Sequence, residues 1–222
     1  MTISYRFLVV SALFVTCLIT ANIIIAKQIS IGGIILPAAI VIFPVSYIIG
    51  DVLTEVYGYQ EARRVIWLGF LCNLITVVAI WLAKILPPAP VFEAQGAYER
   101  ILGSTPRFLL ASFTAYLAGE FANSFVLAKM KIITRGRWLW TRTIGSTLVG
   151  QAVDTVVVLA IAFIGVLPLS VLGLMMVFHW LFKCIYEALA TPLTYVVVGY
   201  LKRKEGVDVY DYGVDFNPLR II

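Results

Sequence analysis

The sequence predicts an all-α membrane protein: a polytopic bundle of six transmembrane helices with both termini in the cytoplasm. Hydrophobic residues make up 61% of the 222 residues, and charged residues make up only 13%. Soluble proteins carry about 25% charged residues, so this composition indicates an integral membrane protein. We expect a single integral membrane domain over residues 1–222, with a short polar cytoplasmic tail at about 203–222.

Six apolar segments follow one another along the chain, and each is long enough for a spanning helix, which needs roughly 20 apolar residues. They are residues 5–26, 35–56, 65–86, 107–128, 143–167 and 171–200. Glycine and proline, which interrupt helices, mark the breaks between them. In order, the breaks lie at Gly32-Gly33 with Pro37, at Gly58, at the proline-rich run 87–90, at Gly136 and at Pro168.

The basic residues give the predicted bundle an orientation. Twelve of the 17 Lys and Arg residues lie on one side: Arg6, Arg63, Arg64, Lys129, Lys131, Arg135, Arg137, Arg142, Lys202, Arg203, Lys204 and Arg220. The opposite side holds Lys27, Arg100 and Arg107. Loops rich in Lys and Arg stay in the cytoplasm, so this bias predicts that both termini are cytoplasmic. The same bias accounts for the net charge of +5 without a nucleic-acid partner.

Five carboxylates interrupt the apolar segments. They are Asp51 and Glu55 in the second segment, Glu120 in the fourth, Asp154 in the fifth and Glu187 in the sixth. An acid at bilayer depth costs about 2.5–3.5 kcal/mol on insertion scales. Such residues persist where they face the interior of a bundle or a water-filled path. Five of them in a small bundle indicate a polar binding site.

Polar residues within the segments fall on defined helix faces, because residues three and four apart are neighbours on a helix. The stripes are Tyr47, Asp51 and Glu55; Ser112, Tyr116, Glu120, Asn123 and Ser124; Thr143, Ser146, Thr147, Gly150, Gln151 and Asp154; and His179, Lys183, Glu187 and Thr191. We expect these four stripes to face one another around a shared cavity. The candidate substrate-binding residues are Glu120, Asp154, Asp51, Glu187, Asn123, Gln151, Lys183, Glu55, Asn22, Tyr116 and Ser146.

Local pairing offers a structural explanation for some of these charges. Lys183 and Glu187 are one helical turn apart and could neutralise each other. Asp51 and Glu55 could pair with Arg63-Arg64 as an anchor, and the hydroxyls could bond between helices. Acids outnumber bases within the segments, so at least one carboxylate is expected to take a proton, a cation or a ligand with N–H donors. A guanine-like edge, with a ring N–H beside an exocyclic amine, offers two such donors to one carboxylate.

The sequence lacks the motifs of common enzymes and of ATP-driven pumps. It has no Walker A motif, no HExxH and no GxSxG. The three cysteines are scattered through apolar segments, and with a single histidine they do not form a zinc site. We therefore expect no enzyme activity, no cofactor and no metal. An intramembrane hydrolase would have to use an acid pair such as Asp51 and Asp154, which no motif supports.

Several long stretches resemble the queuosine precursor transporter family, also called the vitamin uptake transporter family. They are DVLTEVYGYQEARRVIWLGF at 51–70, ASFTAYLAGEFANSFVLAKMK at 111–131, WLWTRTIGSTLVGQAVDT at 138–155 and LFKCIYEALATPLTYVVVGYLKRKEGVDVYDYGVDFNPL at 181–219. The resemblance covers nearly the whole chain, and these strings are specific.

The resemblance implies a six-span importer in the bacterial inner membrane for 7-deazaguanine bases, such as 7-cyano-7-deazaguanine and 7-aminomethyl-7-deazaguanine. It also implies a secondary transporter that acts without an ATPase. The family is similar in topology to the substrate-binding subunits of energy-coupling-factor transporters, so a binding subunit that serves a separate ATPase is the alternative. The expected partners are a purine-like base and the lipid bilayer, and a homodimer stays open.

Overall fold

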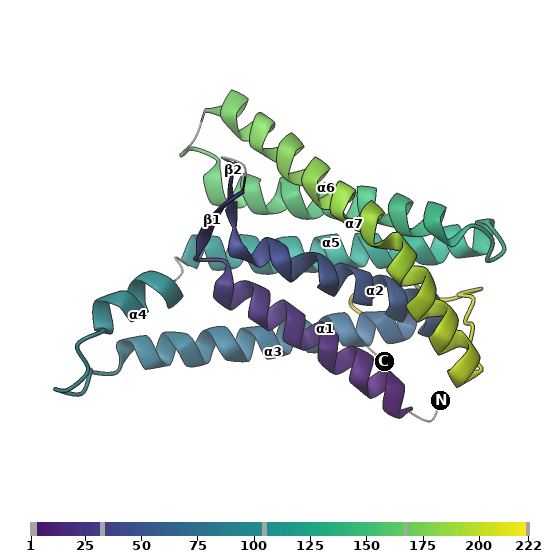
Figure 1. Ribbon diagram of the computed structural model, residues 1–222, viewed down its shortest axis with the longest axis horizontal. Coiled ribbons are helices and arrows are strands. Elements are labelled where there is room, and N and C mark those ends of the chain that lie inside the picture. Colours follow the sequence, from purple (N-terminus) through teal and green to yellow (C-terminus); the bar gives the residue numbers. More distant parts are fainter. Residues whose placement is uncertain (1–3, 32–33, 104–105, 167, 221–222) are drawn as a thin grey trace.

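The computed structural model describes residues 4–31, 34–103, 106–166 and 168–220. Its elements are α1 (Tyr5–Ile24), β1 (Gln28–Ile31), β2 (Ile34–Pro37), the 3-10 helix η1 (Ala38–Val41), α2 (Phe43–Tyr57), α3 (Tyr59–Ile85), α4 (Gln95–Leu102), α5 (Pro106–Ile133), α6 (Leu139–Phe163) and α7 (Leu169–Glu205). The all-α prediction is confirmed, with one small hairpin of β1 and β2 in the described part of the chain. Figure 1 shows the long helices gathered into one bundle.

The short helix α2 lies at the centre of the bundle. It packs against α1, α3, α5 and α7, while α5 and α6 form the most extensive helix pair. Val52 and Val56 of α2 join the main hydrophobic core. That core also includes Phe14 of α1 and Ile66 of α3. The main hydrophobic core therefore extends from α1 and α3 across α2 to residues of α5, α6 and α7.

The second expected segment, residues 35–56, is wrong at its beginning. Residues 28–31 pair with residues 34–37 as antiparallel strands, and α2 begins only at Phe43. Isoleucines are frequent in the hairpin and favour strands, while Pro44 occupies the first turn of α2, where proline is well tolerated. With 15 residues, α2 is about 22 Å long, which is shorter than the roughly 30 Å hydrocarbon core of a bilayer.

Four helices in the described residues are long and apolar enough to cross a membrane: α1, α3, α6 and α7. They indicate a multi-pass membrane protein. The other two helices of the bundle differ from these four. Helix α2 has only 15 residues, and α5 carries Glu120 and Asn123 in its middle. The six expected segments thus correspond to six helices, of which four have the length and composition of spans.

The bundle has two distinct ends (Figure 1). The end that we call the basic end comprises the start of α1, the α2–α3 junction at Gly58, the α5–α6 loop at 134–138 and the tail at 206–220. The opposite end comprises the β1–β2 hairpin, α4 and the α6–α7 turn. Figure 1 shows the basic end on the right and the opposite end on the left.

The tail folds back against the basic end, and α7 itself continues to Glu205. The Tyr59 N–H, at the start of α3, donates to both carboxylate oxygens of Asp211, at 3.0 and 3.1 Å. Burial raises the pKa of Asp211 above its ordinary value, and the Tyr59 hydrogen bond offsets this only in part. The tail is thereby fixed to the first turn of α3.

Candidate functional site

The polar stripes of α2, α5, α6 and α7 meet inside the bundle. Asp51 and Glu120 are each 1% exposed, and Glu187 is 2% exposed. Asp154 is 5% exposed, although it lies in the middle of a helix with the composition of a membrane span. The residues that share this buried region form what we call the central polar cluster: Tyr47, Asp51, Glu120, Asn123, Thr147, Gln151, Asp154, Thr155, Lys183 and Glu187.

Eight buried oxygen atoms of this cluster have no hydrogen-bond partner among the described residues. They are Tyr47 Oη, Asp51 Oδ2, Glu120 Oε2, Asn123 Oδ1, Thr147 Oγ1, Gln151 Oε1, Thr155 Oγ1 and Glu187 Oε1. An unpaired buried polar atom costs about 1–3 kcal/mol, and more when it is charged. Five of the eight are carboxylate or amide carbonyl oxygens, which accept hydrogen bonds. The cluster therefore suits a ligand that donates several N–H or O–H groups.

Two glycines allow α5 and α6 to approach closely within the cluster. A Cβ atom at Gly150 would lie 2.6 Å from Asn123 Cβ, and a Cβ atom at Gly119 would lie 2.8 Å from Asp154 Cβ. The Cβ atom at Gly119 would also lie 2.9 Å from Tyr47 Oη. Any side chain at either position would push the helices apart. The glycines therefore hold side chains of α2, α5 and α6 at one point.

Asn123 connects α5 to the carboxylate of α2. Its Nδ2 donates to Asp51 Oδ1 at 2.6 Å, which leaves the second oxygen of Asp51 and the carbonyl oxygen of Asn123 unpaired. Gly50 precedes Asp51, and a Cβ atom there would lie 3.1 Å from Glu120 Oε2. Two carboxylates, Asp51 and Glu120, are thus held at the interface of α2 and α5.

Lys183 supplies a cation to the cluster, and its partner is Asp154. The Nζ atom lies 2.5 Å from Asp154 Oδ2 and 5.0 Å from the ring centre of Phe43. The alternative in which Lys183 pairs with Glu187 is therefore wrong, because the neighbouring helix α6 offers a closer carboxylate than the next turn of α7. Among the described residues, Glu187 forms no ion pair.

Glu55 belongs to a separate site at the basic end. Its Oε1 accepts from Arg142 Nη2 and from Lys202 Nζ, both at 2.7 Å, and its Oε2 accepts from Arg142 Nε at 3.2 Å. Lys131 Nζ donates to the Glu55 carbonyl at 2.6 Å and to Asp208 at 2.5 Å. Burial alone would raise the pKa of Asp208, but hydrogen bonds from Lys131 and Lys202 outweigh it and lower that pKa. We call these five residues the basic-end ion cluster.

The alternative in which Asp51 or Glu55 pairs with Arg63 or Arg64 is also wrong. Arg63 donates to backbone carbonyls of the tail at 2.7 and 3.1 Å, and Arg64 pairs with Glu61 at 2.6 Å. Both arginines lie beyond the α2–α3 junction, on a new helix with its own direction. The cations that reach Glu55 come instead from α5, α6 and α7.

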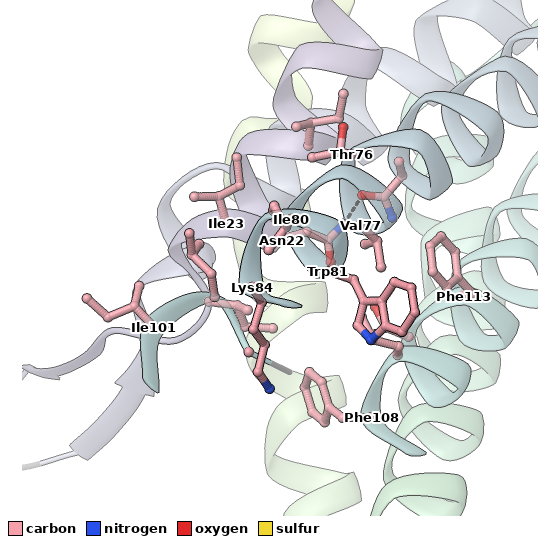
Figure 2. A pocket seen from close by; sticks show the side chains of 17 residues that line it. Asn22, Ile23, Thr76, Val77, Ile80, Trp81, Lys84, Ile101, Phe108 and Phe113 are labelled. Atoms are coloured by element: carbon pink, nitrogen blue, oxygen red, sulfur yellow. Dashed lines mark hydrogen bonds between the residues drawn. The ribbon is translucent and has the colours of Figure 1, made fainter. Parts of the chain in front are cut away.

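Three further candidates lie outside both clusters or are already hydrogen-bonded. Tyr116 Oη donates to a backbone carbonyl of α3, and Ser146 Oγ donates to a carbonyl of its own helix, both at 2.9 Å. Asn22 lies in a different region, where its Nδ2 donates to Asn73 Oδ1 at 3.2 Å. Both asparagines line a cavity between α1, α3, α4 and α5, in which Figure 2 labels Asn22.

Three members of the central polar cluster are not among the candidates from the sequence: Tyr47, Thr147 and Thr155. Tyr47 lies on the predicted stripe of α2, one turn before Asp51. Thr147 and Thr155 lie one turn before and one turn after Gln151 on α6. Tyr47 and Thr147 thus lie on the stripes that the sequence predicts, and the same four-residue spacing leads on to Thr155.

Known proteins are similar to the chain over most of its length. Residues 37–197 match the model of a family described as "Putative vitamin uptake transporter". A relative in Bacillus subtilis (strain 168), described as "Probable queuosine precursor transporter", is 31% identical over 179 residues. The matched region covers 80% of this chain and 78% of the relative. No solved structure matches the chain.

Proposed function

Since this chain belongs to the vitamin uptake transporter family, we propose that it imports queuosine precursors across the bacterial inner membrane. The family consists of transporters, so the chain is a transporter and not an enzyme. The cargo that we propose is a 7-deazaguanine base, either 7-cyano-7-deazaguanine or 7-aminomethyl-7-deazaguanine. The whole chain forms one transport domain in this proposal.

The observation that supports this cargo best is the set of unpaired acceptors in the central polar cluster. A deazaguanine presents a ring N–H and an exocyclic amine on one edge and a pyrrole N–H on another. A carboxylate accepts two parallel hydrogen bonds from such an edge, and bonds to a charged acceptor are about twice as strong as neutral ones. The aminomethyl base also carries a positive charge, which a second carboxylate stabilises.

We assign separate roles to the members of the cluster. Glu120 is the first candidate to bind the guanine-like edge, and Asp51 and Glu187 are the next, because each has an unpaired oxygen. Asp154 is held by Lys183, so it contributes its remaining acceptor capacity and orients the lysine. The amide of Gln151 supplies a further acceptor beside them.

The topology that we propose has six transmembrane helices with both termini in the cytoplasm. The positions of the Lys and Arg residues support it, because they concentrate at the basic end. The basic end is then cytoplasmic, and the hairpin and α4 face the periplasm. A reporter fused after Ile222 is expected to be active only in the cytoplasm. Activity in the periplasm alone would contradict this topology.

The energy source that we propose is a gradient, of the base itself or of protons. The chain has no Walker A motif. The buried acids without a cationic partner, Asp51, Glu120 and Glu187, are suited to carry a proton. Intracellular use of the base would pull a facilitated flux, and a proton gradient would allow accumulation.

The proposal is tested with purified protein in sealed vesicles and a radiolabelled deazaguanine. We expect uptake without ATP, and accumulation under an imposed pH gradient if transport is proton-linked. Glu120→Gln should weaken binding by roughly ten- to hundredfold, since it removes a charged acceptor. Glu61→Gln is the matched control, because Glu61 lies outside both clusters and pairs with Arg64 at the surface.

A second outcome would favour the binding-subunit alternative. If the vesicles take up the base only after an ATPase complex and ATP are added, the standalone transporter is contradicted. Binding of the base by the isolated chain, still sensitive to Glu120→Gln, would then assign it as a substrate-capturing subunit.

A further inference from the structure

The cavity between α1, α3, α4 and α5 (Figure 2) shares no lining residue with the central polar cluster, and residues of α4 at the opposite end of the bundle help to line it. Its polar, charged and aromatic lining includes Asn22, Asn73, Trp81, Lys84, Ser112 and Phe113. Among the described residues that line it, none is acidic, and Lys84 carries the charge. We call it the entry cavity.

A pair of amides forms the polar wall of the entry cavity. Asn22 Nδ2 donates to Asn73 Oδ1 at 3.2 Å, and Ser112 Oγ donates to Asn22 Oδ1 at 3.4 Å. Asn22 is further fixed because its Nδ2 also donates to the Leu18 carbonyl at 3.1 Å. Asn73 is buried, and among the described residues its Nδ2 donates to no acceptor. The wall therefore offers an amide donor beside the Asn22 carbonyl, which has a second lone pair.

Aromatic rings and one cation complete the cavity. Figure 2 shows the Trp81 ring turned toward Phe113, and the Lys84 side chain extended toward Phe108. Trp81 is 57% exposed, so it lies at the rim and leaves a ring face available for stacking. The absence of acidic residues from the described lining distinguishes this cavity from the central polar cluster, which is rich in carboxylates.

One face of α5 connects the two sites. Ser112, Tyr116 and Glu120 follow one another at four-residue spacing. Ser112 and Glu120 are therefore about 12 Å apart along the helix axis. Tyr116 lies between them and donates to the Ile66 carbonyl of α3 at 2.9 Å. A Cβ atom at Gly69 would lie 2.8 Å from Tyr116 Oη, so glycine at this position leaves room for the phenol. Tyr116 thus separates the entry cavity from the central polar cluster.

We propose that the entry cavity binds neutral planar nitrogen heterocycles before they pass Tyr116 to the central polar cluster; this rests on the proposed function. The amide wall supplies a donor and an acceptor to the edge of such a ring, and Trp81 supplies a stacking face. Lys84, without an acid beside it in the lining, disfavours a cationic ligand. The cavity should therefore prefer 7-cyano-7-deazaguanine to the positively charged aminomethyl base.

The test is protection of a single cysteine from a membrane-impermeant thiol reagent. The three native cysteines are replaced by alanine, and Thr76→Cys places a thiol in the cavity lining. With the neutral cyano base at about ten times its Kd, labelling should slow by roughly tenfold. The same protection is expected in a Glu120→Gln background, since the entry cavity does not include the central carboxylates. The aminomethyl base should protect less at equal concentration.

Matched variants separate a binding role from a folding role. Asn73→Ala removes the amide donor and should weaken protection by roughly tenfold. Leu74→Ala changes the adjacent residue, which is exposed on α3, and should leave protection unchanged. If neither base slows the labelling of Thr76→Cys by the thiol reagent, in vesicles that still transport, then the entry cavity does not bind the base. The proposed function would be unaffected by that result. Equal protection by both bases would overturn the preference for a neutral ligand.

Discussion

Glu120 of the central polar cluster and Glu55 of the basic-end ion cluster are buried to nearly the same degree, but their charges are compensated very differently. Glu55 is 0% exposed, and both of its carboxylate oxygens accept hydrogen bonds from cations. Glu120 is 1% exposed, and its Oε2 has no partner among the described residues. Burial of an acid therefore does not by itself indicate a binding site. The unpaired oxygen marks it.

The contrast is sharpest on α2, because that helix contributes one acid to each cluster. Asp51 and Glu55 are one turn apart, about 6 Å along the axis. Asp51 receives a hydrogen bond from a neutral amide, whereas Glu55 receives them from Arg142 and Lys202. The basic-end ion cluster joins α2, α5, α6, α7 and the tail below the proposed binding region. These ion pairs therefore link the elements that meet at the basic end.

The largest effect is expected for Glu55→Gln. This change leaves three buried or half-buried cations around a neutral amide, and breaking a buried ion pair costs about 3–5 kcal/mol. The free energy of unfolding, measured by chemical denaturation in detergent micelles, should fall by that amount. The double variant Glu55→Leu with Arg142→Met should recover part of the loss. If Glu55→Gln lowers the free energy of unfolding no more than the substitution of an exposed acid does, the cations around Glu55 do not stabilise the fold as described.

A smaller effect is expected for Gly150→Ala. The new Cβ atom would lie 2.6 Å from Asn123 Cβ, so α5 and α6 must separate, at a cost of about 1–3 kcal/mol. Because Asn123 then moves, affinity for the base should fall together with stability. Gly173→Ala is the control, since nothing lies within 4 Å of its Cβ position. Gly173→Ala should be as stable as the parent or more so. If Gly150→Ala binds the base with parental affinity, Gly150 does not position Asn123 for binding.

The contact between the tail and α3 should contribute less to the free energy of unfolding. Asp211→Ala removes the acceptor for the Tyr59 N–H at the start of α3, and the loss of such a cap costs about 0.5–2 kcal/mol. Limited proteolysis should then cleave the tail faster than in the parent. Asp215→Ala, which breaks an exposed pair with Arg220, should change neither stability nor cleavage measurably. Equal behaviour of the two variants would show that the tail is not fixed by Asp211.

The smallest effect on stability is expected for Glu120→Gln. Its Oε2 has no partner among the described residues, so the amide removes a buried charge without stranding a cation. The free energy of unfolding should be no lower than that of the parent, in contrast to Glu55→Gln. A loss as large as that of Glu55→Gln would show that Glu120 is structural.

The sequence predicted the stripes of the central polar cluster because their residues are neighbours on single helices. Four-residue spacing placed Asp51 on α2 and Glu120 on α5, and the cost of charge in lipid predicted that both are buried. The same local reasoning failed for the ion pairs. Arg142 is 87 residues from Glu55 in the chain, so only the tertiary packing of the bundle brings them together.

The second expected segment, residues 35–56, shows why hydrophobicity alone does not predict secondary structure. An apolar run from residue 35 fits a spanning helix by composition, yet its first part pairs with residues 28–31 in a hairpin. Hydrophobicity does not distinguish a strand from a helix in a short run rich in isoleucine. The entry cavity could not be predicted from the sequence either, because Asn22 and Asn73 belong to different helices and meet only through tertiary packing.

The most direct measurement is a calorimetric titration of purified protein with 7-cyano-7-deazaguanine. The variants are Glu120→Gln, Asp51→Asn, Glu187→Gln and Asp154→Asn, with Glu61→Gln as the control. We expect the parent and the control to bind the base alike. We expect Glu120→Gln to bind it roughly ten- to hundredfold more weakly while keeping the parental stability. Parental affinity in all four folded amide variants would contradict the assignment of the central polar cluster as the binding site.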